Sequence, residues 1–471
     1  MGRSANKEVK VKQMSLEEIE KFQAKKLRGF LRLVYKFHPY YRNVMKENRL
    51  RPEDFKSVKD IQKLPFTKKE DWVGLEKDFI LRPNKKIIKY LGLKTLLEGI
   101  INREKVKEKL KYEFFPATFF ATSGRTGNSV ACFYTRYDFD LIANHTVEAL
   151  EPILKDLNYN VRLQITFPYA PHLAFWHSVF GWLKEPSVFS IILGAGRSMT
   201  QLDLMQKFKT NALLGMPSYV YHLSELVAEN KVQTNVKYII TAGEYLPENM
   251  KKRIKENFSK FGEEPKILQA YASTESKAAI FERKENDGYI INPSLHLWEV
   301  VDPKTGEQVS FEEGGMLVFT HLDFRGTVFL RYWTDDIISK GLFYEDGSLK
   351  LKGDITRVRD STVLTTKVKG TLVNFLALEN VLSSLKEIKE YQAVIKKKDK
   401  HYYSLDELLV KISIKKRYEK IKEEVIRKVK EIIKDRFEIT PKVKIVPFEN
   451  LVNEIFEKLK GSRVVDLRNK L

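Results

Sequence analysis

The sequence is poor in cysteine and contains no long hydrophobic run. Its 471 residues include a single cysteine, Cys132, which excludes a disulfide framework and a zinc site built from several cysteines. No apolar run approaches the roughly 18 residues typical of a membrane-spanning helix, and the polar, basic first residues contain no apolar segment of a secretory signal. These absences predict a cytoplasmic protein with no membrane partner.

Acidic residues are outnumbered by basic ones, 62 against 83, which gives a formal net charge of +21. A charge of this size is compatible with nucleic-acid binding. The lysines are nevertheless spread along the chain and mixed with glutamate, and no RNA-binding aromatic motif or metal-finger spacing occurs. We therefore expect a basic cleft for an anionic cofactor rather than a nucleic-acid partner. A surface rich in lysine and glutamate is also typical of the ion-pair networks of thermophile proteins.

Hydrophobic periodicity predicts an α/β fold with a large N-terminal domain. Between residues 160 and 280, apolar strand-like runs alternate with helical stretches, as in a largely parallel sheet. The four expected strands lie at 163–167, 188–193, 238–241 and 267–271. A β-rich subdomain is expected over 289–352, so the N-terminal domain should combine parallel and mixed sheets.

A smaller α+β unit is expected after about residue 360, where a new series of strand-like and helical patterns begins. Its predicted elements are strands at 391–395, 408–414 and 442–446 and a helix at 418–437. We therefore predict an N-terminal domain over 1–359 and a C-terminal domain over 360–471.

Two capping patterns predict helix starts near the N-terminus. Ser15 and Glu18 have capping-box spacing before an amphipathic helix over 15–37. Thr67 and Glu70 have the same spacing, and we expect Thr67 to be the N-cap of another helix. Further along, the lysine-rich segment 83–113 is also expected to be helical.

A loop rich in hydroxyls and glycine lies between apolar strand-like runs at 114–120 and 130–134. Its residues are Thr122, Ser123, Gly124, Arg125, Thr126 and Gly127. Glycine lets a backbone approach a ligand closely, and hydroxyls and consecutive N–H groups bind anionic oxygens. The same residues are common in turns, so the loop is either a phosphate-binding loop or an ordinary hairpin turn. It lacks the pattern of the helix-opening phosphate loop.

Three further motifs follow this loop along the chain. They are Tyr271–Glu275 (YASTE) at the end of a predicted strand, Arg331–Asp336 (RYWTDD), and Lys460–Arg468 (KGSRVVDLR). In this order and spacing, the loop and the motifs resemble those of the adenylate-forming superfamily, specifically the phenylacetate–CoA ligase branch of the acyl-CoA synthetases. The resemblance covers most of the chain. It implies that ATP activates a carboxylic acid, that pyrophosphate leaves, and that the acyl group passes to coenzyme A.

The resemblance implies a role for the motif at the end of the predicted strand. Tyr271 would stack on adenine, and Thr274 would contact the α-phosphate. Glu275 would bind Mg²⁺ through its carboxylate oxygens. Ala272 and Ser273 complete the motif. Without the resemblance, the same residues would be read as a strand-end turn with a capping hydroxyl.

Other parts of the ATP site follow from the same resemblance. The loop at 122–127 would wrap the β- and γ-phosphates. The segment Ala242, Gly243 and Glu244 would line the adenine, and the Asp336 carboxylate would accept the ribose hydroxyls. A second ribose contact falls to Arg357 or Arg359, just before the hinge between the domains. Taken alone, residues 242–244 fit a plain β-turn equally well, Asp336 fits an acidic surface pair better, and the two arginines also fit a charged, solvated strand.

The resemblance makes Lys460 the catalytic lysine, carried by a small mobile C-terminal domain. Its ammonium would bridge the carboxylate and the α-phosphate in the transition state. Four positions depart from the pattern of the family. Arg125 replaces a small hydroxyl residue, Asn128 replaces a lysine, and Asp335 and Leu459 replace glycines.

These departures leave three functions open. The first is an AMP-forming carboxylate–CoA ligase. The second is an adenylyltransferase of the same branch that acts on a deazaflavin coenzyme. The third is a non-catalytic or nucleic-acid-binding relative. A homodimer is compatible with each of them, and the sequence does not decide the oligomeric state.

The acid itself is predicted from a single aromatic segment. Phe175, Trp176, Phe180 and Trp182 indicate either a pocket for an aromatic or apolar acid or ordinary core packing. The two histidines of this segment, His172 and His177, are expected to be structural rather than catalytic.

Overall fold

The chain forms two compact units in its computed structural model. Unit 1 comprises Met1–Glu244 and Phe261–Ile355, and unit 2 comprises Tyr245–Lys260 and Thr356–Leu471. The structure describes all residues except 1–13, 85–86, 88–96, 99, 122–129, 170–172, 358–364, 369–370, 398–405, 438, 457–462 and 468–471. The predicted domain boundary at 359/360 lies outside the described residues and stays a prediction.

A nine-stranded sheet organises unit 1, in the order β13-β14-β9-β8-β7-β6-β5-β3-β4. Its parallel part consists of β3 (Val161–Ile165), β4 (Val188–Ile192), β5 (Ala212–Gly215), β6 (Tyr238–Ala242) and β7 (Lys266–Tyr271). Its antiparallel part consists of β8 (Ile280–Phe281), β9 (Tyr289–Ile290), β13 (Gly341–Glu345) and β14 (Ser348–Lys352). The four predicted parallel strands are confirmed, whereas the short β5 was not predicted.

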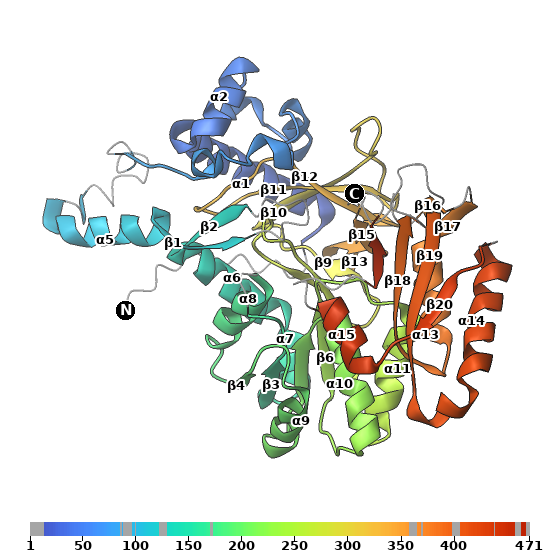
Figure 1. Cartoon of the computed structure of the whole chain (residues 1–471). Coiled ribbons are helices and arrows are strands. Elements are labelled where there is room, and N and C mark those ends of the chain that lie inside the picture. Colours follow the sequence, from blue (N-terminus) through green and yellow to red (C-terminus); the bar gives the residue numbers. More distant parts are fainter. Residues whose placement is uncertain are drawn as a thin grey trace. The chain divides into compact units, whose positions relative to one another are not determined.

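Helices connect the parallel strands, as parallel pairing requires long crossovers. They are α8 (Leu173–Trp182), α9 (Ser198–Lys207), α10 (Pro217–Asn230) and, in unit 2, α11 (Glu248–Ser259). Figure 1 shows α8 and α10 beside the strands that they connect. Pro217 occupies the first turn of α10, where its missing N–H costs nothing.

The N-terminal part of unit 1 is mostly helical. It contains α1 (Leu16–Phe37), α2 (Pro39–Glu47), the short 3₁₀ helices η1 (Pro52–Asp54), η2 (Val58–Lys63), η3 (Lys69–Asp71) and η4 (Glu76–Phe79), and then α5 (Arg103–Phe114), α6 (Arg136–Ala149) and α7 (Glu151–Asp156). The predicted capping box of α1 is confirmed, because Glu18 N donates to Ser15 Oγ and Ser15 N donates to the Glu18 carboxylate. Its buried face joins a large aromatic core.

The expected cap at Thr67 is wrong. The 3₁₀ helix η3 starts after Lys68, whose backbone N donates to Asp71 rather than to Glu70. Thr67 is buried instead, and its hydroxyl donates to the Leu330 carbonyl at 2.8 Å. A buried hydroxyl must find a partner in the interior, and a carbonyl of the adjoining β structure supplies it.

Two further sheets complete unit 1. An antiparallel pair is formed by β1 (Pro116–Ala121) and β2 (Ala131–Thr135), with Ala121 opposite Ala131. A four-stranded sheet contains β10 (His296–Val301), β11 (Gly315–His321), β12 (Tyr332–Ile338) and β15 (Ile355–Arg357), in that order. These elements confirm the predicted strands on both sides of the glycine loop and the predicted β-rich stretch after residue 289.

Unit 2 has its own sheet and core. The sheet has the order β20-β19-β18-β21 and consists of β18 (Ile388–Lys397), β19 (Asp406–Ile414), β20 (Lys442–Ile445) and β21 (Val464–Asp466). The other elements are β16 (Thr365–Val368), β17 (Thr371–Asn374), α13 (Phe375–Ser384), η5 (Lys416–Ile421), α14 (Lys422–Phe437) and α15 (Phe448–Phe456). The predicted strands are confirmed, and the predicted helix at 418–437 begins as the 3₁₀ turn η5. Leucine, isoleucine and valine side chains fill the core.

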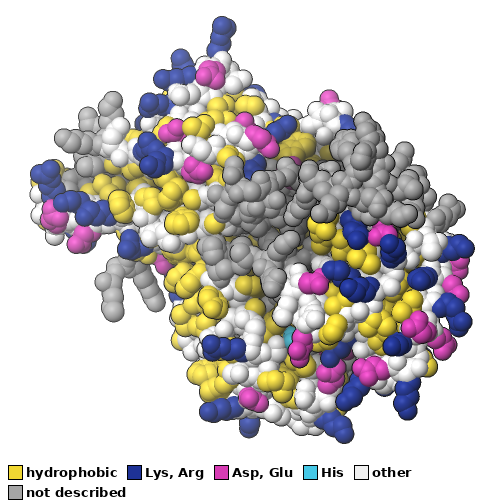
Figure 2. Space-filling model, viewed as in Figure 1, with side chains coloured by type: hydrophobic (Ala, Val, Ile, Leu, Met, Phe, Trp, Pro, Cys, Tyr) yellow, Lys and Arg dark blue, Asp and Glu magenta, His cyan; other side chains and the backbone are white. Residues whose placement is uncertain are grey.

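The surface mixes charges of both signs. On the face drawn in Figure 2, lysine and arginine side chains alternate with acidic ones, and hydrophobic side chains are exposed between them. Across the described ranges, no helix has the length and apolar character needed to cross a membrane.

Candidate active site

The motif Tyr271–Glu275 leaves the sheet at its carboxyl edge. The parallel register places Ala242 of β6 opposite Ala270 of β7, and both strands end within one residue of this pair. The segment after β6 and the loop after β7 therefore start side by side. Ligands of α/β proteins bind at this edge of a parallel sheet.

The loop after β7 closes into a tight turn, and we call residues 272–277 the nucleotide-motif loop. The backbone N of Ser276 donates to Ser273 Oγ at 2.9 Å, and the backbone N of Ser273 donates to Ser276 Oγ at 3.0 Å. Lys277, at the end of the loop, has a φ of 65°. A long side chain in this left-handed region is uncommon and requires support from the surrounding structure.

Tyr271 and Asp336 meet although they are far apart in the sequence. The Tyr271 hydroxyl donates to Asp336 Oδ2 at 2.7 Å. The Asp336 backbone N donates to Thr334 Oγ1 at 3.0 Å, and Thr334 Oγ1 donates to the Leu317 carbonyl at 2.8 Å. The predicted adenine-stacking residue and the predicted ribose acceptor are thereby brought together.

An irregularity in β12 turns Asp336 toward Tyr271. The pairing of β12 with β11 shifts register between Met316 and Val318. Asp335 lies in this irregularity with a φ of 61°. Glycine adopts that conformation freely, and aspartate is among the few other residues that tolerate it. The backbone thus explains why glycine suits position 335 and why Asp335 is an acceptable replacement.

Glu275 is a buried carboxylate with a tyrosine donor. The Tyr332 hydroxyl donates to Glu275 Oε1 at 3.3 Å. Burial, and then the nearby Glu275 charge, raise the pKa of Tyr332 well above its usual range, so the phenol stays protonated as a donor. Thr274 precedes Glu275, and its backbone carbonyl accepts a hydrogen bond from the Tyr134 hydroxyl at 2.7 Å.

One carboxylate fits the way in which proteins hold Mg²⁺ beside phosphates, because Mg²⁺ takes most of its other ligands from phosphates and water. Glu275, two residues before the end of the nucleotide-motif loop, is the residue predicted to supply such an oxygen ligand. In the part of the chain that the structure describes, no group of three or more His, Cys, Asp or Glu side chains could hold a metal ion. The single Glu275 carboxylate fits the role predicted for it, as one ligand of a cation bound together with a nucleotide.

The segment after β6 is a turn fixed by a helix start. Gly243 has a φ of 88°, which a side chain would strain. Glu244 Oε2 accepts from the Ser218 backbone N at 3.1 Å, in the first turn of α10. A carboxylate is favoured at this position because the N-terminal N–H groups of a helix carry partial positive charge.

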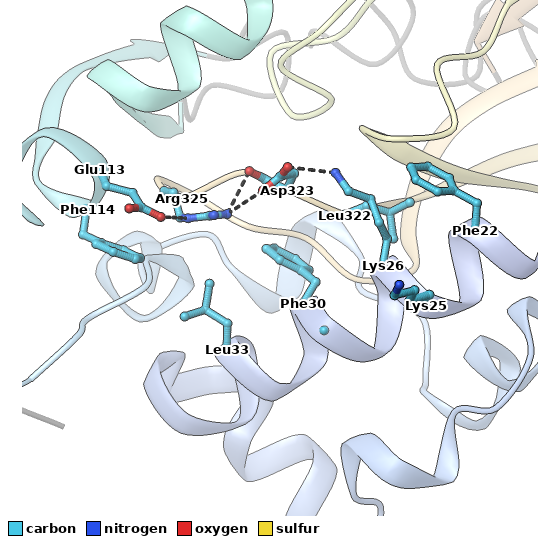
Figure 3. A pocket seen from close by; sticks show the side chains of 11 residues that line it. Phe22, Lys25, Lys26, Phe30, Leu33, Glu113, Phe114, Leu322, Asp323 and Arg325 are labelled. Atoms are coloured by element: carbon cyan, nitrogen blue, oxygen red, sulfur yellow. Dashed lines mark hydrogen bonds and ion pairs between the residues drawn. The ribbon is translucent and has the colours of Figure 1, made fainter. Parts of the chain in front are cut away.

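A separate cavity of about 450 Å³ lies between α1, α5 and the loop at 322–325. Figure 3 shows its charged wall, a chain of ion pairs from Glu113 through Arg325 and Asp323 to Lys26. The distances are 2.8, 3.0 and 2.8 Å. The cavity contains none of the predicted site residues, and its charges already pair with one another.

Comparison with known families decides the class of the protein. The model of the AMP-binding enzyme family matches residues 54–333, and the model of the AMP-binding enzyme C-terminal domain matches residues 372–468. The chain belongs to the AMP-binding enzyme family. The predicted resemblance to the adenylate-forming superfamily is thereby confirmed.

Relatives of this AMP-binding enzyme match it along its whole length. The phenylacetate–coenzyme A ligase of Thermus thermophilus is 25% identical, covering 96% of this chain and 97% of the relative. That of Aromatoleum evansii is 24% identical, covering 98% and 97%. Among solved structures, a 2-hydroxyisobutyryl-CoA ligase in complex with 2-HIB-AMP matches with a TM-score of 0.76 at 20% identity, covering 97% of this chain and 91% of that one. The last match supports the α/β fold class.

Several predicted site residues of this AMP-binding enzyme lie outside the described residues. These are Thr122, Ser123, Gly124, Arg125, Thr126, Gly127, Arg359 and Lys460. Arg357 is the last residue of β15, where only its backbone is described. The roles of these residues remain predictions.

The aromatic segment of the predicted acid pocket is partly core and partly surface. Phe175 and Trp182 are buried, whereas Phe180 is exposed and stacks on Trp176. His177 is buried and hydrogen bonds to Thr146 Oγ1 at 2.7 Å. Burial lowers the pKa of His177 to about 3, as expected of a neutral structural histidine. His172 lies outside the described residues.

Sequence reasoning missed the buried ion pair that anchors the nucleotide-motif loop to the start of α6. Lys277 and Asp138 form a fully buried ion pair at 2.8 Å. The Thr135–Asp138 spacing is a capping-box pattern, which could have located the start of α6. No local pattern pairs Asp138 with a lysine 139 residues later.

Proposed function

We propose that this AMP-binding enzyme is an AMP-forming carboxylate–CoA ligase. It activates a carboxylic acid with ATP to an acyl-adenylate and transfers the acyl group to coenzyme A. The observation that supports the proposal is the hydrogen bond from Tyr271, at the end of β7, to Asp336 of β12, with the buried Glu275 four residues after Tyr271 along the chain. The full-length similarity to phenylacetate–coenzyme A ligases supports it.

The first half-reaction joins two anions. A carboxylate oxygen of the acid attacks the α-phosphorus of ATP, a P–O bond forms, and the bond to pyrophosphate breaks. Tyr271 and Asp336 hold the nucleoside, while Thr274 and Glu275 face the α-phosphate and its cation. Glu275 would hold Mg²⁺, which would supply charge neutralisation for the leaving pyrophosphate. Lys460 then stabilises the developing charge between acid and phosphate.

The second half-reaction breaks the acyl–phosphate bond. The thiolate of coenzyme A attacks the acyl carbon, a thioester forms, and AMP leaves with the electron pair. Two structures matched by this chain contain 2-HIB-AMP together with coenzyme A. The ligands of these complexes support the same order of events for this enzyme.

The finer parts of the proposal come from the sequence. The residues 122–127 bind the β- and γ-phosphates, and Arg357 or Arg359 contacts the ribose. The acid is aromatic or apolar, in keeping with the segment 173–182. A cytoplasmic location, a thermophilic host and a homodimer complete the prediction.

ATP–pyrophosphate exchange tests the proposal. The enzyme is incubated with labelled pyrophosphate, ATP and a panel of aryl and fatty acids, with and without coenzyme A. We expect exchange that depends on the acid and proceeds without coenzyme A. Exchange stimulated only by a deazaflavin coenzyme would assign the adenylyltransferase function. Absence of ATP binding by calorimetry, with salt-sensitive RNA binding, would assign the non-catalytic function.

A further inference from the structure

A fully buried lysine ends the nucleotide-motif loop. Lys277 follows Glu275 by two residues, and neither its side chain nor that of Asp138 is exposed to solvent. Lys277 Nζ donates to Asp138 Oδ2 at 2.8 Å and to the Phe133 carbonyl at 3.0 Å. It also lies 4.6 Å from the ring centroid of Tyr134, a cation–π distance. The lysine therefore ties the loop to β2 and to the start of α6.

Asp138 is a junction of three segments of unit 1. Besides Lys277, its carboxylate accepts from the backbone N of Thr135 at 3.1 Å, of Arg325 at 2.8 Å and of Gly326 at 2.9 Å. The backbone at Gly326 packs tightly against β2, because a Cβ at Gly326 would lie only 2.1 Å from the Phe133 carbonyl oxygen. A charge held by four donors is fixed in position, and so is the ammonium that it binds.

A second contact joins the same strand to the same loop. Tyr134, in β2, donates its hydroxyl to the Thr274 carbonyl. Adjacent residues of β2 thus hold the nucleotide-motif loop at two points, Phe133 through Lys277 at its end and Tyr134 through Thr274 in its interior. Glu275 lies between these two anchors, so its backbone can shift only if one of them breaks.

Stability alone is a poor reason to bury this pair. Removing two charges from water costs several kcal/mol for each ion, and a well-packed apolar pair of the same volume is often as stable or more so. The left-handed backbone at Lys277 adds strain. Both costs fall next to the residues that are expected to face the α-phosphate and its cation.

We propose that Lys277 is a positioning residue for adenylation. Through Asp138 and the Phe133 carbonyl it fixes the backbone of Thr274 and Glu275 relative to Tyr271 and Asp336, a role that rests on the proposed function. Lys277 does not touch the substrate. It acts by holding the groups that do.

Charge-removing variants test this role. Lys277→Met, Asp138→Asn and the double variant are compared with Lys350→Met, a matched control in the same unit. Lys350 is also buried, and its Nζ lies 2.6 Å from Asp287. Each variant is measured by thermal unfolding, by calorimetric ATP binding, and by kcat and KM in pyrophosphate exchange at a temperature where it is folded.

The expected result separates positioning from stability. Lys277→Met should weaken ATP binding and lower the kcat of exchange by about tenfold or more, with KM for the acid changed less than about twofold. Lys350→Met should lose stability but keep the ATP affinity and kcat of the wild type. The double variant should be no worse than the poorer single variant, because both changes break one contact.

Two outcomes would overturn parts of this picture separately. If folded Lys277→Met keeps the ATP affinity and kcat of the control, the positioning role is wrong even though the proposed function stands. If the wild type shows no acid-dependent exchange, the proposed function fails. Should Lys277→Met not fold, Tyr134→Phe removes only the hydroxyl that reaches Thr274, and we expect about a threefold loss in kcat. Unchanged kcat in Tyr134→Phe would contradict the claim that the contacts of β2 with the loop position Thr274 and Glu275 for adenylation.

Discussion

Two buried ion pairs involve residues that closely follow, along the sequence, two of the predicted catalytic residues, Glu275 and Lys460. In unit 1, Lys277 follows Glu275 by two residues and pairs with Asp138. In unit 2, Arg463 follows Lys460 by three residues and pairs with Glu390. Two nitrogens of its guanidinium donate to the two oxygens of the Glu390 carboxylate, each at 2.8 Å. The two pairs are similar in burial and differ in what they connect.

The difference lies in the backbone that each pair supports. Arg463 precedes β21, which already pairs with β18 through the Ala393–Val464 register, so the arginine reinforces an existing ladder. Lys277 ends a loop whose backbone belongs to no strand, and Asp138 joins that loop to other segments. We infer that the unit 2 pair mainly stabilises its sheet, whereas the unit 1 pair mainly fixes the nucleotide-motif loop.

The largest expected effect comes from the residue ahead of the unit 2 pair. Lys460→Ala should lower ATP–pyrophosphate exchange by about 10²–10³-fold, because the transition state loses its bridging cation. Transfer from a preformed acyl-adenylate to coenzyme A should survive. Both half-reactions are measured separately on the same preparation. Exchange at the wild-type rate would remove Lys460 from the mechanism.

The next effect concerns the residue that meets Tyr271. Asp336→Asn should raise KM for ATP about ten- to hundredfold, since hydrogen bonds to a charged acceptor contribute about 1.5–3 kcal/mol. Asp335→Gly is the matched control, because its φ of 61° suits glycine and should leave KM within about twofold. Steady-state exchange kinetics measure both. Equal KM values in the two variants would contradict a ribose-binding role for Asp336.

A smaller effect on activity is expected from the unit 2 pair itself. Arg463→Met leaves Glu390 buried without its partner, which should lower the unfolding free energy of unit 2 by about 3–5 kcal/mol. Exchange by the folded protein should fall less than about tenfold. Hydrogen exchange of β18 and β21 reports the stability. Lys442→Met removes an exposed lysine from the largely buried Glu407, which keeps Lys396 as a second partner at 3.6 Å, and should cost no more than about 1 kcal/mol. Equal losses in both variants would argue against the reinforcing role.

The smallest effect is a pH dependence confined to unit 1. Burial lowers the pKa of His177 and His296 to about 3 and that of His145 to about 4. As the pH falls, these three histidines become protonated in the unfolded chain before they do in the folded protein. The free energy of unfolding that they contribute is therefore complete above about pH 6.5 and is lost as the pH falls toward about 4. In the wild type, each such histidine changes the equilibrium constant of unfolding by up to about tenfold per pH unit. His177→Gln should remove the share of this pH dependence that comes from His177. Denaturant titrations between pH 4 and 7 provide the test, and an unchanged slope would contradict it.

Sequence pattern predicted the regular parts of this fold well. The parallel strands, the capping box of α1 and the strands of unit 2 follow from local periodicity and capping chemistry. The four residues of β5 were too few to show periodicity. Thr67 had capping spacing, but its hydroxyl was drawn to the Leu330 carbonyl by burial. Local rules fail where a distant partner competes for the same group.

The candidate site divides in the same way. The order of the motifs led, through the resemblance to the adenylate-forming superfamily, to the prediction of Tyr271, Glu275 and Asp336 as nucleotide-binding residues. Lys277 and Asp138 could not be paired in advance, since their contact depends on how β2, α6 and the loop at 325–326 pack. A buried ion pair leaves no periodic trace in the sequence.

Product analysis tests the central claim most directly. The enzyme is incubated with ATP, an aryl acid that supports exchange, and coenzyme A, and the products are identified by phosphorus NMR and mass spectrometry. A carboxylate–CoA ligase of the AMP-forming type predicts equal amounts of AMP, pyrophosphate and acyl-CoA. Formation of ADP and phosphate, or of a nucleotidylated coenzyme without acyl-CoA, would contradict it.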